Sequence, residues 1–220
     1  MNKEQVQQRV LQNGKPLDLS KFEWDENTNT FSSSEGGLVL DFSVMDYCTF
    51  NTSFNCTFKT GYDCTFKTGS NCTFNTCSNC AFNTYSDCTF DTGSDCTFKT
   101  YSDCTFNTGS YCTFKTGSSC TFNTSFNCTF NTGSDCTFKT GYDCTFDTWS
   151  DCIFKTGSEC VVVRRDVYEV IELEDGKEIK LNSWGIKGYT EVNNKKSELL
   201  KKADELISKA QELKDEANKL

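Results

Sequence analysis

The spacing of the cysteines constrains the fold of this chain more than any other feature. From Cys48 to Cys160 a cysteine recurs every eight residues, and only Cys77 is out of phase. Each repeat reads Cys-Thr-Phe-x-Thr-Gly-Ser-Asp with small variations, and fourteen copies run from Cys48 to Glu159. Eight residues of α-helix turn through roughly 800°, about 80° more than two full turns, so the cysteines would spiral around a helix. The period therefore argues against a helical repeat.

An extended conformation suits the same repeat. Side chains alternate along a strand, which places Cys, Phe and the second Thr on one face and the first Thr and the variable residue on the other. The variable residue is always Asn, Lys or Asp, so this second face is expected to be solvated. Gly-Ser-Asp predicts a corner, in which Gly adopts a positive φ and Asp or Asn bonds to nearby backbone. Strands and corners without reversal predict an all-β fold, a right-handed β-solenoid.

The corner residues bear on how many octads close one coil. Five of the six copies that lack the corner glycine lie 24 residues apart, and Tyr85 is the exception. This spacing favours a triangular solenoid with three octads, or 24 residues, per coil. A two-sided coil of 16 residues, with a duplicated 24-residue segment, is the alternative. The six positions are Ser53, Cys77, Tyr85, Tyr101, Ser125 and Trp149.

Segments on either side of the repeat are expected to cover the open strand edges of a solenoid. We expect an N-terminal cap over residues 1–39, with a short helix over 2–12, and the octapeptide solenoid over 40–159. A C-terminal β cap is expected over 160–192. Its strands are predicted at 161–173, at the partner segment 178–181, and at 184–192.

Residues 193–220 are rich in Lys, Glu, Leu and Ala and predict a heptad helix. Leucine recurs every seven residues with alanine between, which is the seam of a coiled coil. We expect this helix to make the protein a homo-oligomer. The seam consists of Leu199, Ala203, Leu206, Ala210, Leu213, Ala217 and Leu220.

The cysteines are interpreted as reduced thiols in the core, because free Cys is a small and frequently buried residue. Disulfides are disfavoured because parallel Cys in adjacent coils would hold their Cβ atoms about 4.8 Å apart, beyond the usual 3.5–4.5 Å. The one CxxC, Cys77-Ser-Asn-Cys80, has no second pair and the chain has no His, so we expect no metal site and no cofactor. Cys77, at a corner, is expected to be the exposed thiol.

Aromatic residues fall into two groups. The phenylalanines of the repeat share the cysteine face and are expected in the core, whereas other aromatics lie at corners. Of these, Tyr85, Tyr101 and Trp149 are candidates for a surface that binds a protein partner. The repeat carries six Lys and ten acidic residues, and without a basic stripe we expect no direct binding of nucleic acid.

Composition limits the classes of function. With no His, every Ser-His or Cys-His triad is excluded, and no pair of titratable groups occupies an inferable cleft, so we expect no enzyme and assign no catalytic residue. No run of about 18 apolar residues is present, and the first residues lack the apolar stretch of a secretory signal. We therefore expect a cytoplasmic protein without membrane contact.

The run Cys-Thr-Phe-Lys-Thr-Gly-Ser-Asn and the exit Cys-Val-Val-Val-Arg-Arg-Asp-Val resemble the cysteine-rich octapeptide-repeat proteins of bacteria and their phages. The resemblance covers residues 1–192 and implies a solenoid without catalytic residues. The chain is more distantly similar to pentapeptide-repeat proteins, some of which are acidic β-helices that mimic DNA. It differs from them in its period and in its modest charge.

Three interpretations of function follow. The leading one is a non-catalytic structural or scaffold rod, in a phage-related assembly, oligomerised by its C-terminal helix. The second is a protein-binding module or a nucleic-acid mimic. The third is ice binding through the outward threonines, and the Lys or Asp two residues from a Thr works against it.

Overall fold

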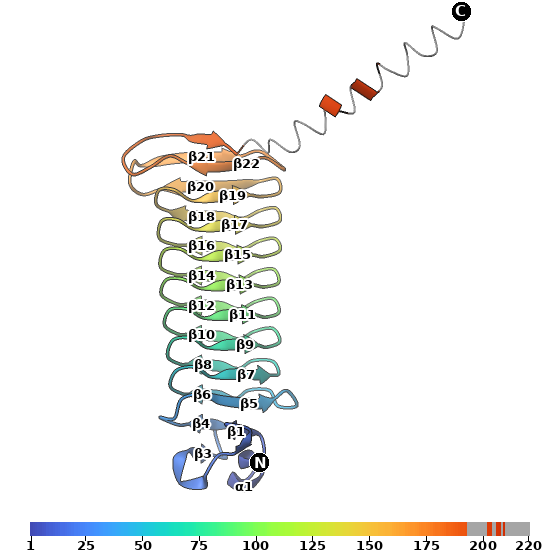
Figure 1. Ribbon diagram of the computed structural model, residues 1–220, viewed down its shortest axis with the longest axis vertical. Helices are drawn as coiled ribbons and strands as arrows, with labels where there is room; N and C mark the ends of the chain where they lie inside the picture. Colours follow the sequence, from blue (N-terminus) through green and yellow to red (C-terminus); the bar gives the residue numbers. More distant parts are fainter. Residues whose placement is uncertain (193–201, 204–205, 208, 210–220) are drawn as a thin grey trace, which may run out of the picture. The chain divides into compact units, whose positions relative to one another are not determined.

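Backbone hydrogen bonds pair each strand of the repeat with the strand two octads away along the chain. In the middle of the solenoid, Thr105 lies beside Thr121 and Phe106 beside Phe122, in parallel register. The same step of 16 residues relates every neighbouring pair of strands from residue 49 to residue 155. The protein is thus a two-sided β-solenoid with two octads per coil (Figure 1). The expected 24-residue coil is wrong, and its 16-residue alternative is the observed one.

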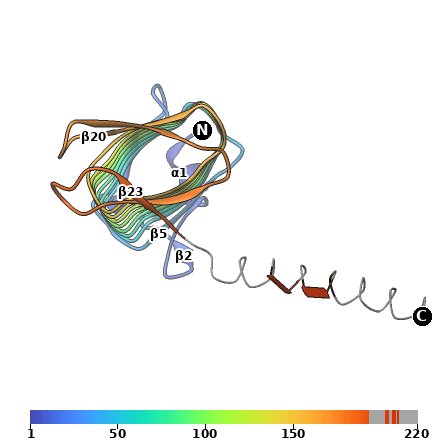
Figure 2. The same ribbon diagram turned by 90° about the horizontal axis from the view of Figure 1, so that it is seen from above.

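The computed structural model describes residues 1–192 and, beyond them, Lys202, Ala203, Leu206, Ile207 and Lys209. Within residues 1–192 the strands form two sheets, which face each other when viewed down the solenoid axis (Figure 2). Sheet 1 has twelve strands in the order β2 (Lys15–Pro16), β1 (Val10–Gln12), β5 (Leu38–Phe42), β7 (Thr57–Thr60), β9 (Thr73–Asn75), β11 (Thr89–Asp91), β13 (Thr105–Asn107), β15 (Thr121–Asn123), β17 (Thr137–Lys139), β19 (Ile153–Lys155), β22 (Glu178–Leu181) and β23 (Tyr189–Glu191).

Sheet 2 has eleven described strands, in the order β21 (Glu169–Leu173), β20 (Cys160–Arg164), β18 (Thr145–Thr148), β16 (Thr129–Asn131), β14 (Thr113–Lys115), β12 (Thr97–Lys99), β10 (Ala81–Asn83), β8 (Thr65–Lys67), β6 (Thr49–Asn51), β4 (Thr30–Ser32) and β3 (Glu23–Asp25). The parallel stack begins before the first cysteine, because β4 and β5 already pair in parallel with β6 and β7.

Two columns of phenylalanine fill the space between the sheets. Phe106 stacks on Phe90 and Phe122 of its own column, with ring centroids 4.8 Å apart and ring planes within 2°. It meets Phe98 and Phe114 of the facing column edge-on, at 5.2 Å. The sequence prediction of an inward Cys, Phe and second Thr is confirmed, since these positions are buried along most of the repeat.

The roles of the corner residues differ from those predicted from the sequence. The left-handed backbone conformation falls on the last residue of every octad, and not on the glycine. Asn or Asp occupies eleven of these fourteen positions, and these two residue types tolerate that conformation best after glycine. Glycine is needed for close approach instead: a Cβ on Gly109 would overlap the Ser94 hydroxyl and lie 2.8 Å from the Ser94 backbone nitrogen.

Antiparallel strands end both sheets at both ends. At the N-terminal end β1 pairs with β5 and β3 with β4, and at the C-terminal end β21 pairs with β20 and β22 with β19. Helix α1 (Lys3–Gln7) and the short 3-10 helix η1 (Leu19–Lys21) complete the N-terminal end. These segments cover strand edges that would otherwise pair with another chain.

Two details of the ends differ from the sequence predictions. The helix expected over 2–12 is confined to α1, and Val10–Gln12 is strand β1. The strand expected over 161–173 is divided into β20 and β21, which pair with each other, so β22 pairs with β19 instead. The turn between β20 and β21 is closed by a buried ion pair, Arg164 Nη2 to Asp166 Oδ2 at 2.6 Å.

The phenyl columns should dominate stability. We expect Phe106→Ala to lower the free energy of unfolding by roughly 3–5 kcal/mol, because it removes a ring packed against four others. Asn107→Ala, on the exposed face of the same strand, should cost about 1 kcal/mol or less. Urea unfolding followed by circular dichroism measures both, and similar losses would contradict the inward assignment of Phe.

The corner glycines should be sensitive to a single methyl group. Gly109→Ala is expected to destabilise the protein by about 1–3 kcal/mol, because the added Cβ meets the preceding coil. Ser125, which follows Gly109 in the same corner column, already carries a Cβ, so Ser125→Ala should change stability by less than about 0.5 kcal/mol. Equal thermal transitions for the two variants would show that the corner is not tight.

Candidate functional site

Fifteen of the sixteen thiols are buried. They form two columns, because successive cysteines precede strands of alternate sheets. Cys77 is half-buried at a corner. From Cys72 to Cys144 the single hydrogen of each buried thiol is shared by two backbone carbonyls, one two residues back and one in the preceding coil. Cys104, for example, donates to Ser102 O at 3.4 Å and to Tyr85 O at 3.6 Å. The thiols therefore satisfy corner carbonyls that face the interior, in addition to filling space.

The two columns of thiols contain no disulfide and no group of residues arranged to hold a metal ion. All sixteen cysteines are free, and the described residues contain no group of three or more Cys, Asp or Glu side chains arranged to hold a metal ion. Neighbouring thiols shift one another's pKa in both directions: Cys104 and Cys72 lower the pKa of Cys88, whereas Cys112 and Cys80, followed by burial, raise the pKa of Cys96. The same causes, from Cys120 and Cys152, raise the pKa of Cys136. Because fifteen of the thiols are buried, reagents in solution do not reach them, and reactive chemistry is not expected inside the solenoid.

Thiol labelling tests this arrangement. At pH 7.5 a thiol reagent should modify about one group in the folded protein, because the reagent must reach a thiol to react and fifteen of the thiols are buried. All sixteen should react in denaturant. Cys77→Ser should abolish the fast reaction with the reagent. Several fast-reacting thiols in that variant would contradict the burial of the two thiol columns.

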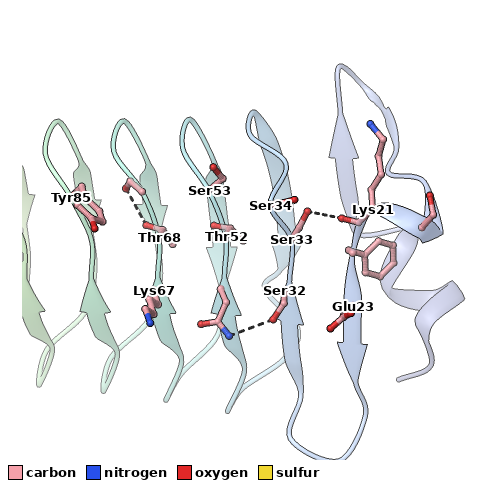
Figure 3. A pocket seen from close by; sticks show the side chains of 14 residues that line it. Lys21, Glu23, Ser32, Ser33, Ser34, Thr52, Ser53, Lys67, Thr68 and Tyr85 are labelled. Atoms are coloured by element: carbon pink, nitrogen blue, oxygen red, sulfur yellow. Dashed lines mark hydrogen bonds between the residues drawn. The ribbon is translucent and has the colours of Figure 1, made fainter.

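The outer face of sheet 2 carries a groove that begins at the N-terminal cap. One hollow, of about 840 Å³, extends from Lys21 across β4, β6 and β8 to Tyr85, and a second, of about 420 Å³, continues to Gly117. The two share Lys67, Thr68 and Tyr85, so they form one continuous feature, here called the sheet 2 groove. Figure 3 shows its first part, where two rows of side chains cross the strands: Thr68, Thr52 and Ser33 in one, and Lys67, Ser32 and Glu23 in the other.

A pair of stacked tyrosines borders the groove. Tyr85 and Tyr101 occupy the glycine position of adjacent coils, with ring centroids 5.2 Å apart and planes within 8°. Their side chains stay exposed, at 57% and 60%. The next residues of this corner column are Gly69 on one side and Gly117 on the other, which offer no side chain to cover the outer ring faces.

Three lysines line the groove at the position after Phe. Lys67, Lys99 and Lys115 lie on β8, β12 and β14 and are exposed. Among the described residues none of the three forms an ion pair. Lys21, at the start of the groove, differs because it pairs with Glu35 at 3.3 Å. The Gln12 amide and then Lys21 hold the pKa of Glu35 below its usual value.

Sheet 1 presents a different surface at the same position. There the amide of Asn123 donates to Asn107 Oδ1 at 3.0 Å, and the amide of Asn107 donates to Asp91 Oδ1 at 2.9 Å. These polar groups satisfy one another along the face. The middle of sheet 2, in contrast, keeps its ammonium groups available.

The 16-residue coil also separates the charges of the repeat. All six lysines lie on the two flat faces, at the position after Phe. Eight of the ten acidic residues lie at the edges, at the left-handed corner position; only Asp91 and Asp147 lie on the faces. The lysines therefore lie on faces that carry few carboxylates.

The structure brings together only part of the predicted partner surface. Tyr85 and Tyr101 form the stack described above, whereas Trp149 lies three coils further along the same corner column. Trp149 stacks on Trp184 of the C-terminal cap at 4.9 Å, and the Arg165 guanidinium lies 5.4 Å from its ring. Trp149 thus contacts the cap and is half-buried.

The predicted oligomerisation seam falls mostly outside the described residues. Ala203 and Leu206 are described, have helical backbone and are exposed. Leu199, Ala210, Leu213, Ala217 and Leu220 lie outside the described residues.

Sequence reasoning missed the row of lysines. At a step of 24 residues Lys67 is followed by Asp91, so the charges looked mixed. At the true step of 16, Lys67, Lys99 and Lys115 fall on one sheet, with Asn83 between the first two. Only the correct coil length places these three lysines in one row.

Comparisons of the chain with protein-family models, with curated proteins and with solved structures found no match. The described residues contain no helix that is long and apolar enough to cross a membrane.

Proposed function

We propose that this protein is a non-catalytic structural rod that holds other components at a set distance. The observation that supports the proposal most is the unbroken register of the coils. Nine parallel strands, β4 to β20, follow one another in sheet 2, which gives a stack of about 38 Å at the usual strand spacing. At both ends the parallel stack is followed by antiparallel strands.

The interior supports a mechanical role. Each phenyl ring stacks on the rings above and below, and each coil bonds to the next through backbone and corner groups. Ser118 illustrates the corner: its nitrogen donates to the Ser102 hydroxyl, and its own hydroxyl accepts from the Ser134 nitrogen, both at 3.1 Å. Bending the rod would disturb many such contacts together, so we expect it to be stiff.

The two other interpretations receive less support. A nucleic-acid mimic needs a dense acidic stripe, yet the faces carry lysine and the acidic residues are divided between two edges. Ice binding needs flat threonine rows without charge, but Thr65 shares its strand face with Lys67, and Thr97 with Lys99. A phage-related assembly stays a proposal that rests on the resemblance of the repeat.

Self-association through residues 193–220 is part of the proposal. Leu206 and Ile207 are each 67% exposed in the described chain, which is unfavourable for two large apolar side chains in water. Pairing the Leu/Ala seams of two or three copies would cover them. The rod would then be displayed as a dimer or trimer.

Truncation tests the oligomer. The full chain should be a dimer or trimer by light scattering, and a chain that ends at Asn194 should be a monomer with an unchanged β-type circular dichroism spectrum. The truncated chain should keep its thermal transition, because the described coils and caps end before this segment.

A matched pair of variants controls for the loss of chain. Leu206→Asp places a charge in the seam and should give a monomer, whereas Ser208→Asp, at the outer position of the same heptad, should leave the oligomer intact. A monomeric full-length protein would overturn this part of the proposal.

A further inference from the structure

The sheet 2 groove combines three features that a structural rod does not require. It has two open aromatic ring faces, a wall of neutral hydrogen-bonding groups, and a row of lysines without ion pairs. The repeat itself would supply Gly at residues 85 and 101, so both tyrosines are departures from its pattern. We propose that this groove binds a glycan chain that bears carboxylate groups.

The ring faces select a ligand with flat apolar patches. The outer face of Tyr85 opens over Gly69, and that of Tyr101 opens over Gly117, each at one end of the tyrosine pair. A sugar ring presents C–H groups on one face, and these pack against the electron-rich face of an aromatic ring. Each glycine leaves room for one such ring beside a tyrosine.

The walls suit a ligand with many hydroxyl groups. Around Gly69 the groove is lined by Ser33, Asn51 and Ser53, whereas the hydroxyl of Thr52 is buried. Hydroxyl and amide groups of this kind both donate and accept hydrogen bonds, as sugar hydroxyls do. Ser33 already donates to Lys21 O and Asn51 to the Ser32 hydroxyl, so sugar hydroxyls would add hydrogen bonds to these groups.

The lysines add a requirement for negative charge at a few points along the groove. Lys67 and Lys99 are two coils apart and Lys99 and Lys115 one coil apart, which corresponds to about 10 Å and 5 Å along the rod. Carboxylates on some of the sugar rings match this sparse spacing. Each would form a charge-assisted contact with a lysine that has no other ion pair.

A nucleic acid strand fits the groove less well. It carries a phosphate at every nucleotide, and its binding depends on many basic contacts. Asp87 and Asp103 follow the two tyrosines at the corner and are exposed, so they would repel a dense polyanion. The same carboxylates can accept hydrogen bonds from sugar hydroxyls.

Calorimetric titration of the full-length protein tests the inference. The probes are the hexasaccharides of hyaluronan and of unsulfated chondroitin, which carry a carboxylate on every second ring, with the methyl ester of the hyaluronan hexasaccharide and a thymidine oligonucleotide as comparisons. At least one carboxylated glycan should bind saturably, and the uncharged ester and the oligonucleotide should bind at least about tenfold more weakly than it does.

Two pairs of variants locate the site. Tyr85→Gly with Tyr101→Gly restores the pattern of the repeat and should weaken binding about tenfold or more, whereas Tyr62→Ser with Tyr142→Ser, which also restores the pattern, should have no effect. Replacing Lys67, Lys99 and Lys115 with Gln should weaken binding similarly. The same change at Lys59, Lys139 and Lys155 on sheet 1 should leave it within about twofold.

Thermal transitions verify that each variant is folded. The inference is overturned if neither carboxylated glycan binds, if the oligonucleotide binds as tightly, or if the sheet 1 variants lose as much affinity as the groove variants. None of these results affects the oligomeric state of the truncated chain, which light scattering measures. The binding inference and the proposed structural role are therefore tested separately.

Discussion

Backbone hydrogen bonding between coils is the constraint on which the rest of this structure depends. It fixes successive coils at the spacing of neighbouring strands, about 4.8 Å. The phenyl rings of one column stack at 4.8 Å in the middle of the repeat, so the distance that suits the backbone also suits the core. One Phe per octad is therefore sufficient, because the two facing columns interlock edge to face.

The same spacing explains the composition of the corners. Coils this close leave no room for a Cβ at Gly109, and they bring each corner serine within hydrogen-bonding distance of the next. Cysteine fits the remaining position because it is small and its thiol donates weakly to inward-facing carbonyls, as Cys104 does. A valine of similar size could not donate to those carbonyls, so the thiol adds a weak hydrogen bond to acceptors that already bond to Asp87 N and the Thr84 hydroxyl.

Stacking also turns single residues into columns, and so makes surfaces from a simple repeat. A residue type that recurs at a step of 16 becomes a row on one sheet, as Lys67, Lys99 and Lys115 do. A substitution in two adjacent coils becomes an aromatic pair, as at Tyr85 and Tyr101. Small departures from the repeat can therefore place charged or aromatic side chains in a row on one face of the rod while the core stays unchanged.

The sequence by itself determined the solenoid, the inward Cys and Phe, and the burial of fifteen thiols, because these follow from strand alternation within a single octad. The coil length was decided only by the tertiary structure. Successive octads are nearly identical, so local patterns cannot tell whether Thr105 pairs with Thr121 or with a residue one octad further on. The role of the corner glycines and the alignment of the three groove lysines depend on that register, since both arise from contacts between coils.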